Sequence, residues 1–333
     1  MASECVDGAG TRVPRYARPR DSGELARVAL GTMNFGKRTS PAESERIVRR
    51  ALERGVTVFD TANAYNDGES ERLLGRALGA ARDRVCIATK VGFGRIGGKP
   101  EGLAPARVRE ALDESLARLG AARVGLYYLH VPDHATPIER TLEGVAAVLE
   151  SGKAERFAVS NYASWQILEI HAACARLDLP KPTVAQQLYN LLIRQLDLEY
   201  FRFARRYALH TTVYNPLAGG LLTGRYRVGD AVTPGTRFHQ NRLYQGRYWS
   251  TRMLDLAAAH ETLAREAGFT PTAFAYAWLA GAPGVDSILV GPGDVAQLDE
   301  ALDAVTRLLP EDVRARVDAL YRESVGTETS YAR

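Results

Sequence analysis

Short apolar runs alternate with amphipathic segments along almost the whole chain. Runs rich in β-branched residues predict strands, and apolar residues three and four positions apart predict helices. The pattern predicts strands at residues 28–31, 56–60, 85–90, 124–130, 156–160, 183–187, 211–214 and 287–290. It predicts helices at residues 41–54, 69–78, 105–119, 138–149, 165–175, 198–208, 253–267, 271–279 and 296–308. Ser40 followed by Pro41 is typical of a helix start.

Strand-then-helix units that repeat in this way favour the α/β class and a closed (β/α)8 barrel, the TIM barrel. A doubly wound open sheet is the alternative, because it also alternates strands and helices. The number of units and the polar strand ends in all parts of the chain favour the barrel. We expect one barrel domain over residues 25–333, with a long loop after the seventh strand and a C-terminal extension. Residues 1–24 are expected to form a flexible tail.

The composition restricts the function classes. The 333 residues are 46 % hydrophobic and 25 % charged, which is typical of a globular protein. No run approaches the roughly 20 apolar residues of a membrane helix, and the N-terminus lacks the pattern of a secretion signal. The net charge of +4 is spread over helix faces that also carry acids, which argues against nucleic acid as a partner. Three cysteines without a CxxC pair indicate reduced thiols, so we expect a cytoplasmic protein that binds no membrane.

The candidate chemistry lies where the predicted strands end, because barrels of this type carry their active sites there. Three consecutive strands end at Asp60, Lys90 and His130, and Tyr65 follows in the loop after Asp60. We expect Lys90 to lower the pKa of the Tyr65 phenol, and Asp60 to orient Lys90. His130 would polarise a substrate oxygen, and Tyr65 would protonate it during carbonyl reduction. Each residue alone also has an ordinary interpretation, such as a helix cap or a surface charge.

With these motifs, the sequence resembles the aldo-keto reductase superfamily from about residue 28 to the C-terminus. The matching segments are Leu30-Gly-Thr-Met33, Phe59-Asp-Thr-Ala-Asn-Ala-Tyr65, Ala88-Thr-Lys90, Tyr127-Tyr-Leu-His130, Val159-Ser-Asn-Tyr162, Gln186-Gln-Leu-Tyr-Asn190 and the run from Tyr214 to Tyr226. Within the superfamily it is most similar to the branch of aflatoxin-aldehyde and succinic semialdehyde reductases. The resemblance implies NADPH as cofactor and aldehydes as substrates, including aromatic aldehydes that bear a carboxylate.

The resemblance also implies roles for individual residues. The catalytic group would be Asp60, Tyr65, Lys90 and His130. The cofactor would contact Met33, Asp60, Ser160, Asn161, Gln187, Tyr214, Asn215, Pro216, Leu217, Gly219, Gly220, Leu221, Thr223, Gly224, Arg225, Arg237, Gly291, Gly293 and Gln297. The substrate would contact His130, Tyr244, Arg247 and Arg333.

The chain departs from the family pattern after the eighth strand. Gly293 stands where relatives generally carry a polar or basic residue, and Ala301 stands where they carry asparagine. Asp294 adds a negative charge near the expected 2′-phosphate. NADPH remains the expected cofactor because Arg225 and Arg237 are present, and use of NADH stays open.

Two motifs are weaker candidates. Gly92-Phe-Gly94-Arg-Ile-Gly97 has dinucleotide-binding spacing, but no helix start follows, so we interpret it as a mobile loop near the active site. His130 and His134 are separated by a proline and have no further ligand nearby, so no metal site is expected.

Two alternatives to a simple aldehyde reductase stay open. One is a ketoreductase that acts on a sugar or natural-product intermediate. The other is a regulatory subunit that binds the cofactor without turnover, as channel-associated members of the superfamily do. The branch often forms dimers, so a homodimer also stays open, because no residue pattern in the chain tests it.

Overall fold

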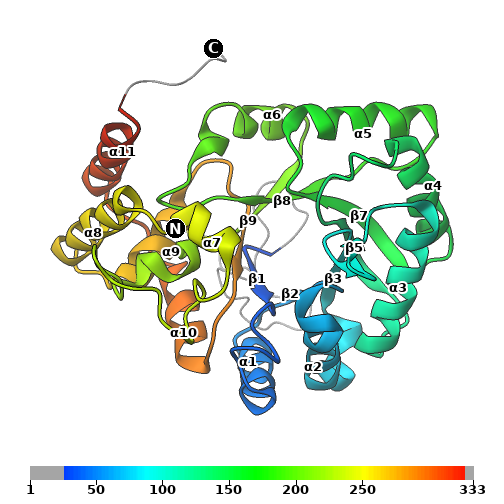
Figure 1. Ribbon diagram of the computed structural model, residues 1–333, viewed down its shortest axis with the longest axis horizontal. Helices are drawn as coiled ribbons and strands as arrows, with labels where there is room; N and C mark the ends of the chain where they lie inside the picture. The colour runs from blue at the N-terminus through cyan, green and yellow to red at the C-terminus, as the bar shows by residue number, and fades with distance from the viewer. Residues whose placement is uncertain (1–25, 327–333) are drawn as a thin grey trace, which may run out of the picture.

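The protein folds as a barrel of parallel strands surrounded by helices (Figure 1). The structure, a computed structural model, describes residues 26–326. The barrel strands are β1 (Val28–Gly31), β2 (Val58–Asp60), β3 (Cys86–Val91), β6 (Val124–Leu129), β7 (Ala154–Ser160), β8 (Val184–Leu188), β9 (His210–Tyr214) and β10 (Ser287–Val290). β1 pairs with both β2 and β10, which closes the sheet. The prediction of a closed (β/α)8 barrel is therefore confirmed, and the open sheet is excluded. The tail predicted at residues 1–24 lies outside the described residues.

Helices follow the strands and cover the outside of the barrel (Figure 1). They are α1 (Pro41–Glu53), α2 (Glu69–Leu78), α3 (Pro105–Leu119), α4 (Ile138–Glu150), α5 (Ser164–Arg176), α6 (Tyr200–Arg206), α7 (Arg242–Tyr248), α8 (Thr251–Glu266), α9 (Pro271–Gly281), α10 (Val295–Ala304) and α11 (Glu311–Val325). Short 3-10 turns include η2 (Tyr65–Gly68), η3 (Gly79–Arg84), η4 (Gln195–Asp197) and η5 (Ala218–Thr223). None of the helices within residues 26–326 combines the length and the apolar character needed to cross a membrane.

The local sequence explains several helix starts. Ser40 caps α1 by accepting a hydrogen bond from the Glu43 amide, and Pro41 occupies the first helical position, as predicted. Thr270 caps α9 in the same way, again with a proline next in the chain. Such caps satisfy backbone N–H groups that have no partner inside the helix.

The core has two parts because strand side chains alternate between two faces. The larger part fills the space between the sheet and the helices. A smaller cluster fills the barrel interior and includes Val58, Ala88, Leu126, Tyr128 and Ala158. Two positions further along β2 and β3, the residues on this inner face are Asp60 and Lys90. The apolar interior therefore gives way to polar groups at the carboxyl ends of the strands.

Three segments differ from the prediction. Residues 92–100 contain a small hairpin, β4 (Arg95–Ile96) with β5 (Lys99–Pro100), which the prediction of a mobile loop did not include. Gly97 and Gly98 both have positive φ, which suits a tight hairpin turn. α7 lies inside the long loop after β9. The sequence pattern did not predict it, because its apolar face is short and the loop is rich in glycine and arginine. α10 ends at Ala304 rather than at residue 308, and α11 forms the C-terminal extension.

Candidate active site

Asp60 and Lys90 form an ion pair at the carboxyl ends of β2 and β3. Their side chains are 3 % and 0 % exposed. Lys90 Nζ donates to Asp60 Oδ1 and to the Thr61 carbonyl oxygen, the latter at 2.7 Å. The other Asp60 oxygen accepts from Gln186 Nε2 at 2.9 Å. Fixed polar partners therefore compensate the burial of both charges.

Tyr65 lies next to this pair, in the turn η2 that follows β2. Asn66 has a left-handed backbone with φ of 51°, and its Nδ2 donates to the Phe35 carbonyl oxygen at 2.6 Å, which holds the turn in place. Lys90 Nζ lies 5.2 Å from the centre of the Tyr65 ring. The ring of His130 meets the Tyr65 ring edge-on, with 5.8 Å between the centres. The four residues predicted as a catalytic group thus lie together at one end of the barrel.

The surroundings of Tyr65 raise the pKa of its phenol. Burial is the main cause, and the negative charge of Asp60 acts in the same direction. Lys90, which the sequence predicted to lower this pKa, donates its hydrogen bond to Asp60, and its own effect on the phenol stays a prediction. The Tyr65 phenol is consequently protonated at neutral pH, which is the state that a proton donor requires.

His130 is held in its neutral form. Its side chain is buried, and burial together with the charge of Lys90 lowers its pKa well below the usual value of 6.5. Its ring packs 5.1 Å from the ring of Phe93, which is 52 % exposed. Within residues 26–326 the His130 Nδ1 atom has no hydrogen-bond partner. A neutral imidazole can donate a hydrogen bond to a ligand oxygen, as the predicted role requires.

A second polar group lies at the carboxyl ends of β7, β8 and β9 and comprises Ser160, Asn161, Gln187 and Tyr214. Asn161 Oδ1 accepts from Tyr214 Oη at 2.6 Å, and Asn161 Nδ2 donates to the His130 carbonyl oxygen at 2.9 Å. Gln187 Nε2 donates to the Tyr162 carbonyl oxygen at 2.7 Å. Ser160 Oγ donates to a β8 carbonyl oxygen at 3.0 Å. These bonds fix amide and hydroxyl groups near His130, and such groups fit the carboxamide of a nicotinamide ring.

The loop after β9 depends on glycine. Gly219, Gly220 and Gly224 have φ of 70°, 108° and 74°, conformations that glycine adopts most readily. A Cβ at Gly219 would lie 2.9 Å from the Tyr244 ring, and the Gly219 amide donates to Asn215 Oδ1 at 2.8 Å. The loop also contains the predicted cofactor residues Pro216, Leu217, Leu221, Thr223 and the exposed Arg225. Its contact with a pyrophosphate stays a prediction.

Two arginines converge on Asn34, in the loop after β1. Arg237 Nη2 donates to Asn34 Oδ1 at 2.6 Å, and Arg38 Nε donates to the same atom at 3.4 Å. Arg237 also reaches Met33 Sδ at 3.5 Å. Burial and the positive charge of Arg237 lower the pKa of Arg38 to about 10, so Arg38 stays charged at neutral pH. Within residues 26–326 the two guanidiniums contact Asn34, Met33 and the Tyr244 ring but no carboxylate, so this corner of the site attracts anions.

The loop after β10 lies beside these arginines, because Asn34 Nδ2 donates to the Gly291 carbonyl oxygen at 3.2 Å. Asp294 caps α10, and its two oxygens accept from the Gln297 amide and Nε2 at 2.8 and 2.7 Å. Gln297 Oε1 accepts from the Gly293 amide at 2.9 Å. The charge of Asp294 is therefore turned toward a helix N-terminus, which stabilises it. Ala301 is fully buried in the core and offers no polar contact.

The sequence pattern did not single out Arg38 or Asn34. Both belong to the loop after β1. This strand ends in Gly31, so it has no ionisable residue at its end to mark the loop as part of a site. Two features of the sequence could have pointed to Arg38 as a site residue. It follows a barrel strand, and no acid stands next to it in the sequence.

Tyr244 and Arg247, two of the predicted substrate residues, lie on α7. The Tyr244 ring centre is 5.3 Å from the Arg237 guanidinium carbon, and Tyr244 is close enough to Tyr65 to act on its pKa. Burial raises the pKa of Tyr214, and the positive charge of Arg247 acts in the opposite direction. Both residues therefore lie on the side of the site formed by the long loop. Arg333 lies outside the described residues.

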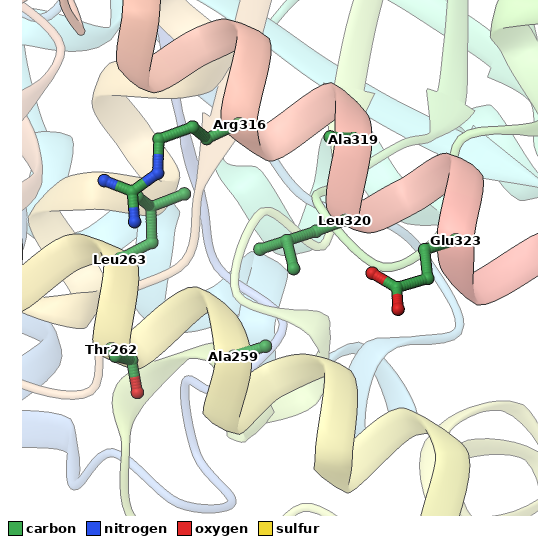
Figure 2. A pocket seen from close by; sticks show the side chains of 7 residues that line it. All are labelled: Ala259, Thr262, Leu263, Arg316, Ala319, Leu320 and Glu323. Atoms are coloured by element: carbon green, nitrogen blue, oxygen red, sulfur yellow. The ribbon is translucent and has the colours of Figure 1, made fainter.

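Two surface hollows of about 430 Å³ lie away from this site. One is lined by Arg72, Arg76, Ala117 and Arg118. Figure 2 shows the other, a largely apolar groove between α8 and α11. Neither contains a residue of the catalytic group, so the candidate active site is located by its side-chain chemistry rather than by these hollows.

The comparisons with known proteins agree with this geometry. The model of the "Aldo/keto reductase family" matches residues 27–322. The chain is 38 % identical to human "Aflatoxin B1 aldehyde reductase member 2", over 91 % of this chain and 90 % of the relative. It is 37 % identical to human "Aldo-keto reductase family 7 member A3", over 83 % and 87 %. It is 32 % identical to an Arabidopsis thaliana "Probable voltage-gated potassium channel subunit beta", over 82 % and 85 %.

The closed barrel, with polar residues at the carboxyl ends of its strands, is the arrangement of a (β/α)8-barrel enzyme. The chain belongs to the aldo/keto reductase family, and it is an NAD(P)H-dependent oxidoreductase. The expected enzyme class is thereby confirmed. The roles of the individual site residues stay predictions.

Proposed function

We propose that this protein reduces aldehydes or ketones to alcohols with NADPH, and that Tyr65 donates the proton. The observation that carries the proposal is the position of the Tyr65 phenol beside a buried Lys90–Asp60 pair and the His130 ring. Reduction of a carbonyl group needs a hydride at carbon and a proton at oxygen. A reduced nicotinamide, when bound, supplies the hydride.

The polar residues have separate tasks in this proposal. Tyr65 keeps its proton at neutral pH and transfers it to the carbonyl oxygen as negative charge develops there. Lys90 supplies a positive charge near the ring, which stabilises the phenolate that remains. Asp60 keeps the ammonium in position. His130 donates a hydrogen bond to the carbonyl oxygen and orients it toward Tyr65.

The anion-attracting corner at Asn34 supports NADPH over NADH. Arg38 and Arg237 lack a carboxylate partner among the described residues, and a phosphate group forms charge-assisted hydrogen bonds with guanidiniums. Asp294 does not oppose this, because both of its oxygens are bound to Gln297 at the start of α10. In this proposal the two arginines hold the 2′-phosphate that distinguishes NADPH from NADH.

The names of relatives support an aldehyde substrate, and one side chain supports a carboxylate on it. A human relative and a rat relative are both named "Aflatoxin B1 aldehyde reductase member 2". Arg247 on α7 supplies a guanidinium that is suited to a carboxylate.

A direct assay tests the proposal. The purified protein is mixed with NADPH and either 4-nitrobenzaldehyde or 2-carboxybenzaldehyde, and the loss of NADPH absorbance and the alcohol product are followed. We expect turnover with both aldehydes. Tight binding of NADPH without alcohol formation from either aldehyde would contradict the proposal.

The Arabidopsis relative favours one second candidate, a regulatory subunit that binds the cofactor and lacks turnover. The same assay separates the two functions, because the regulatory alternative predicts cofactor binding without product. The presence of the complete Asp60, Tyr65, Lys90 and His130 group supports the enzyme.

A further inference from the structure

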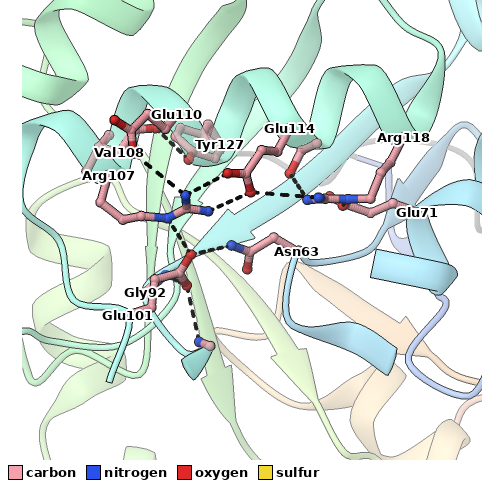
Figure 3. Close-up of polar contacts among 12 residues, drawn as sticks. Asn63, Glu71, Gly92, Glu101, Arg107, Val108, Glu110, Glu114, Arg118 and Tyr127 are labelled. Carbon is pink, nitrogen blue, oxygen red and sulfur yellow. Dashed lines mark hydrogen bonds and ion pairs between the residues drawn. The ribbon is translucent and has the colours of Figure 1, made fainter. Parts of the chain in front are cut away.

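The carboxylate of Glu101 accepts hydrogen bonds from several residues, and Figure 3 shows those from Gly92, Asn63 and Arg107. Its side chain is only 2 % exposed. One oxygen accepts from the amides of Gly92 and Gly94, at 2.8 and 3.2 Å. The other accepts from Asn63 Nδ2 at 2.6 Å and from Arg107 Nε at 2.9 Å. No role in the proposed reaction has so far been given to this buried acid.

These contacts join three segments of the chain. Gly92 and Gly94 flank Phe93 at the base of the β4–β5 hairpin. Asn63 precedes Tyr65 by two residues. The backbone N–H of Asn63 donates to the Lys90 carbonyl oxygen at 3.2 Å. Arg107 belongs to α3 on the outside of the barrel. One carboxylate therefore ties the Phe93 segment both to the loop that carries Tyr65 and to the rigid shell of helices.

The local backbone turns Phe93 toward His130. Gly92 has φ of 108°, and a Cβ at this position would lie 2.7 Å from Leu103 Cδ2, so only glycine fits. The Phe93 ring packs against the His130 ring, and the residue is still 52 % exposed. An exposed aromatic ring next to the group that orients the carbonyl oxygen offers a flat apolar face to the rest of the substrate.

Arg107 also binds Glu114, which is 48 % exposed on α3. Its Nη1 and Nη2 atoms each donate to Glu114 at 2.8 Å, whereas its Nε atom donates to Glu101. Arg118 Nε continues the network to the buried Glu71, which accepts from Thr89, the residue before Lys90. Glu114 binds Arg107 but neither the hairpin nor Asn63, so it provides a matched control.

We infer that Glu101 is a positioning residue that holds Phe93 against His130, and that Phe93 gives the enzyme a preference for aromatic over small aliphatic aldehydes. The inference rests on the proposed function, since it assigns His130 to the substrate. Glu101 acts through the two amides that flank Phe93. The contact of Glu101 with Asn63 keeps the Phe93 ring in a fixed position relative to Tyr65.

The first test compares selectivity, as the ratio of kcat/KM for 4-nitrobenzaldehyde to that for propanal. An aromatic contact contributes enough to predict a roughly tenfold lower ratio in Phe93→Ala, mainly through KM for the aromatic aldehyde. Glu101→Gln is expected to lower the ratio in the same direction, because one amide oxygen cannot replace both acceptors. Adding Glu101→Gln to Phe93→Ala should lower it no further. Glu114→Gln should leave it unchanged.

The second test does not depend on turnover. The His130 imidazole resonances, assigned with His130→Gln in protein labelled at histidine, report the ring current of Phe93. We expect them to shift in Phe93→Ala and in Glu101→Gln but not in Glu114→Gln. Glu101→Asp, which keeps a charge beside Arg107 but is too short to reach all partners, replaces Glu101→Gln if that variant does not fold.

Wild-type His130 resonances or wild-type selectivity in Glu101→Gln would overturn the inference. So would the same changes in Glu114→Gln. If the wild-type protein reduced no aldehyde while the resonances shifted as expected, the positioning of Phe93 would stand. In that case the proposed function and the aromatic preference built on it would fail.

Discussion

Lys90 and Asp60, from neighbouring strands of the barrel, form an ion pair that is almost completely buried. Each charge has a second fixed partner, the Thr61 carbonyl oxygen for Lys90 and the Gln186 amide for Asp60. Tyr65 lies beside this pair, so the pair controls the charge that its phenol experiences. The proposed catalysis therefore depends on a feature that also affects stability.

Removal of one member of the pair should destabilise the fold strongly. Asp60→Asn leaves the Lys90 ammonium buried without its counter-charge, so we expect the free energy of unfolding to fall by about 3–5 kcal/mol. Lys90→Met should have a similar effect, and the double variant should lose much less than the sum. Urea unfolding of the four proteins measures this coupling. Strictly additive losses would show that the two charges do not compensate each other.

The sequence predicted the barrel because strand and helix periodicities repeat along the chain. It also predicted that Asp60, Lys90 and His130 lie together, because they end consecutive strands and parallel strands bring their carboxyl ends together. Both arguments need only local patterns and the general rules of the fold.

The remaining features depend on contacts between distant segments, which no local pattern encodes. The raised pKa of Tyr65 follows from burial and from the negative charge of the nearby Asp60. The approach of Arg38 to Arg237 depends on the fold of the long loop after β9. The role of Asp294 as a helix cap depended on where α10 begins.

The two arginines at Asn34 should decide the choice of cofactor. Arg38→Gln removes one guanidinium, so we expect the Kd for NADPH to rise about tenfold, while the Kd for NADH changes less than about threefold. Arg237→Gln should act in the same direction. Lys37→Gln, which removes a charge from the neighbouring exposed residue, is the matched control. Equal weakening of NADPH and NADH binding would show that Arg38 does not recognise the 2′-phosphate.

Arg247 should select for a carboxylate on the substrate. Loss of a charge-assisted hydrogen bond predicts that Arg247→Gln lowers kcat/KM for 2-carboxybenzaldehyde by about 10- to 100-fold. The value for 4-nitrobenzaldehyde should change little. Arg242→Gln alters an exposed arginine on the same helix and should affect neither substrate. Equal losses for both aldehydes in Arg247→Gln would argue against a carboxylate contact.

A buried histidine far from the strand ends should make stability depend on pH. His260 donates through Nδ1 to the Leu256 carbonyl oxygen, and burial lowers its pKa to about 4. Between about pH 4 and 6.5 the unfolded chain binds a proton at this residue that the folded protein does not bind. The free energy of unfolding therefore falls as the pH drops through this window.

His260→Gln removes this titration. We expect its stability to fall less steeply with decreasing pH, by up to about 1.4 kcal/mol per pH unit relative to the wild type. Urea unfolding at a series of pH values checks the slope. Parallel curves for the two proteins across the window would exclude His260 as a source of the pH dependence.

The most direct test of the account is the kinetics of Tyr65→Phe, which removes the phenolic hydroxyl and keeps the ring against Lys90 and His130. We expect kcat with 4-nitrobenzaldehyde to fall by about 100-fold or more, because general acid catalysis is lost. The Kd for NADPH, measured by fluorescence quenching, should stay within about threefold of the wild type. A variant that binds NADPH normally and retains near-wild-type kcat would contradict the assignment of Tyr65 as proton donor.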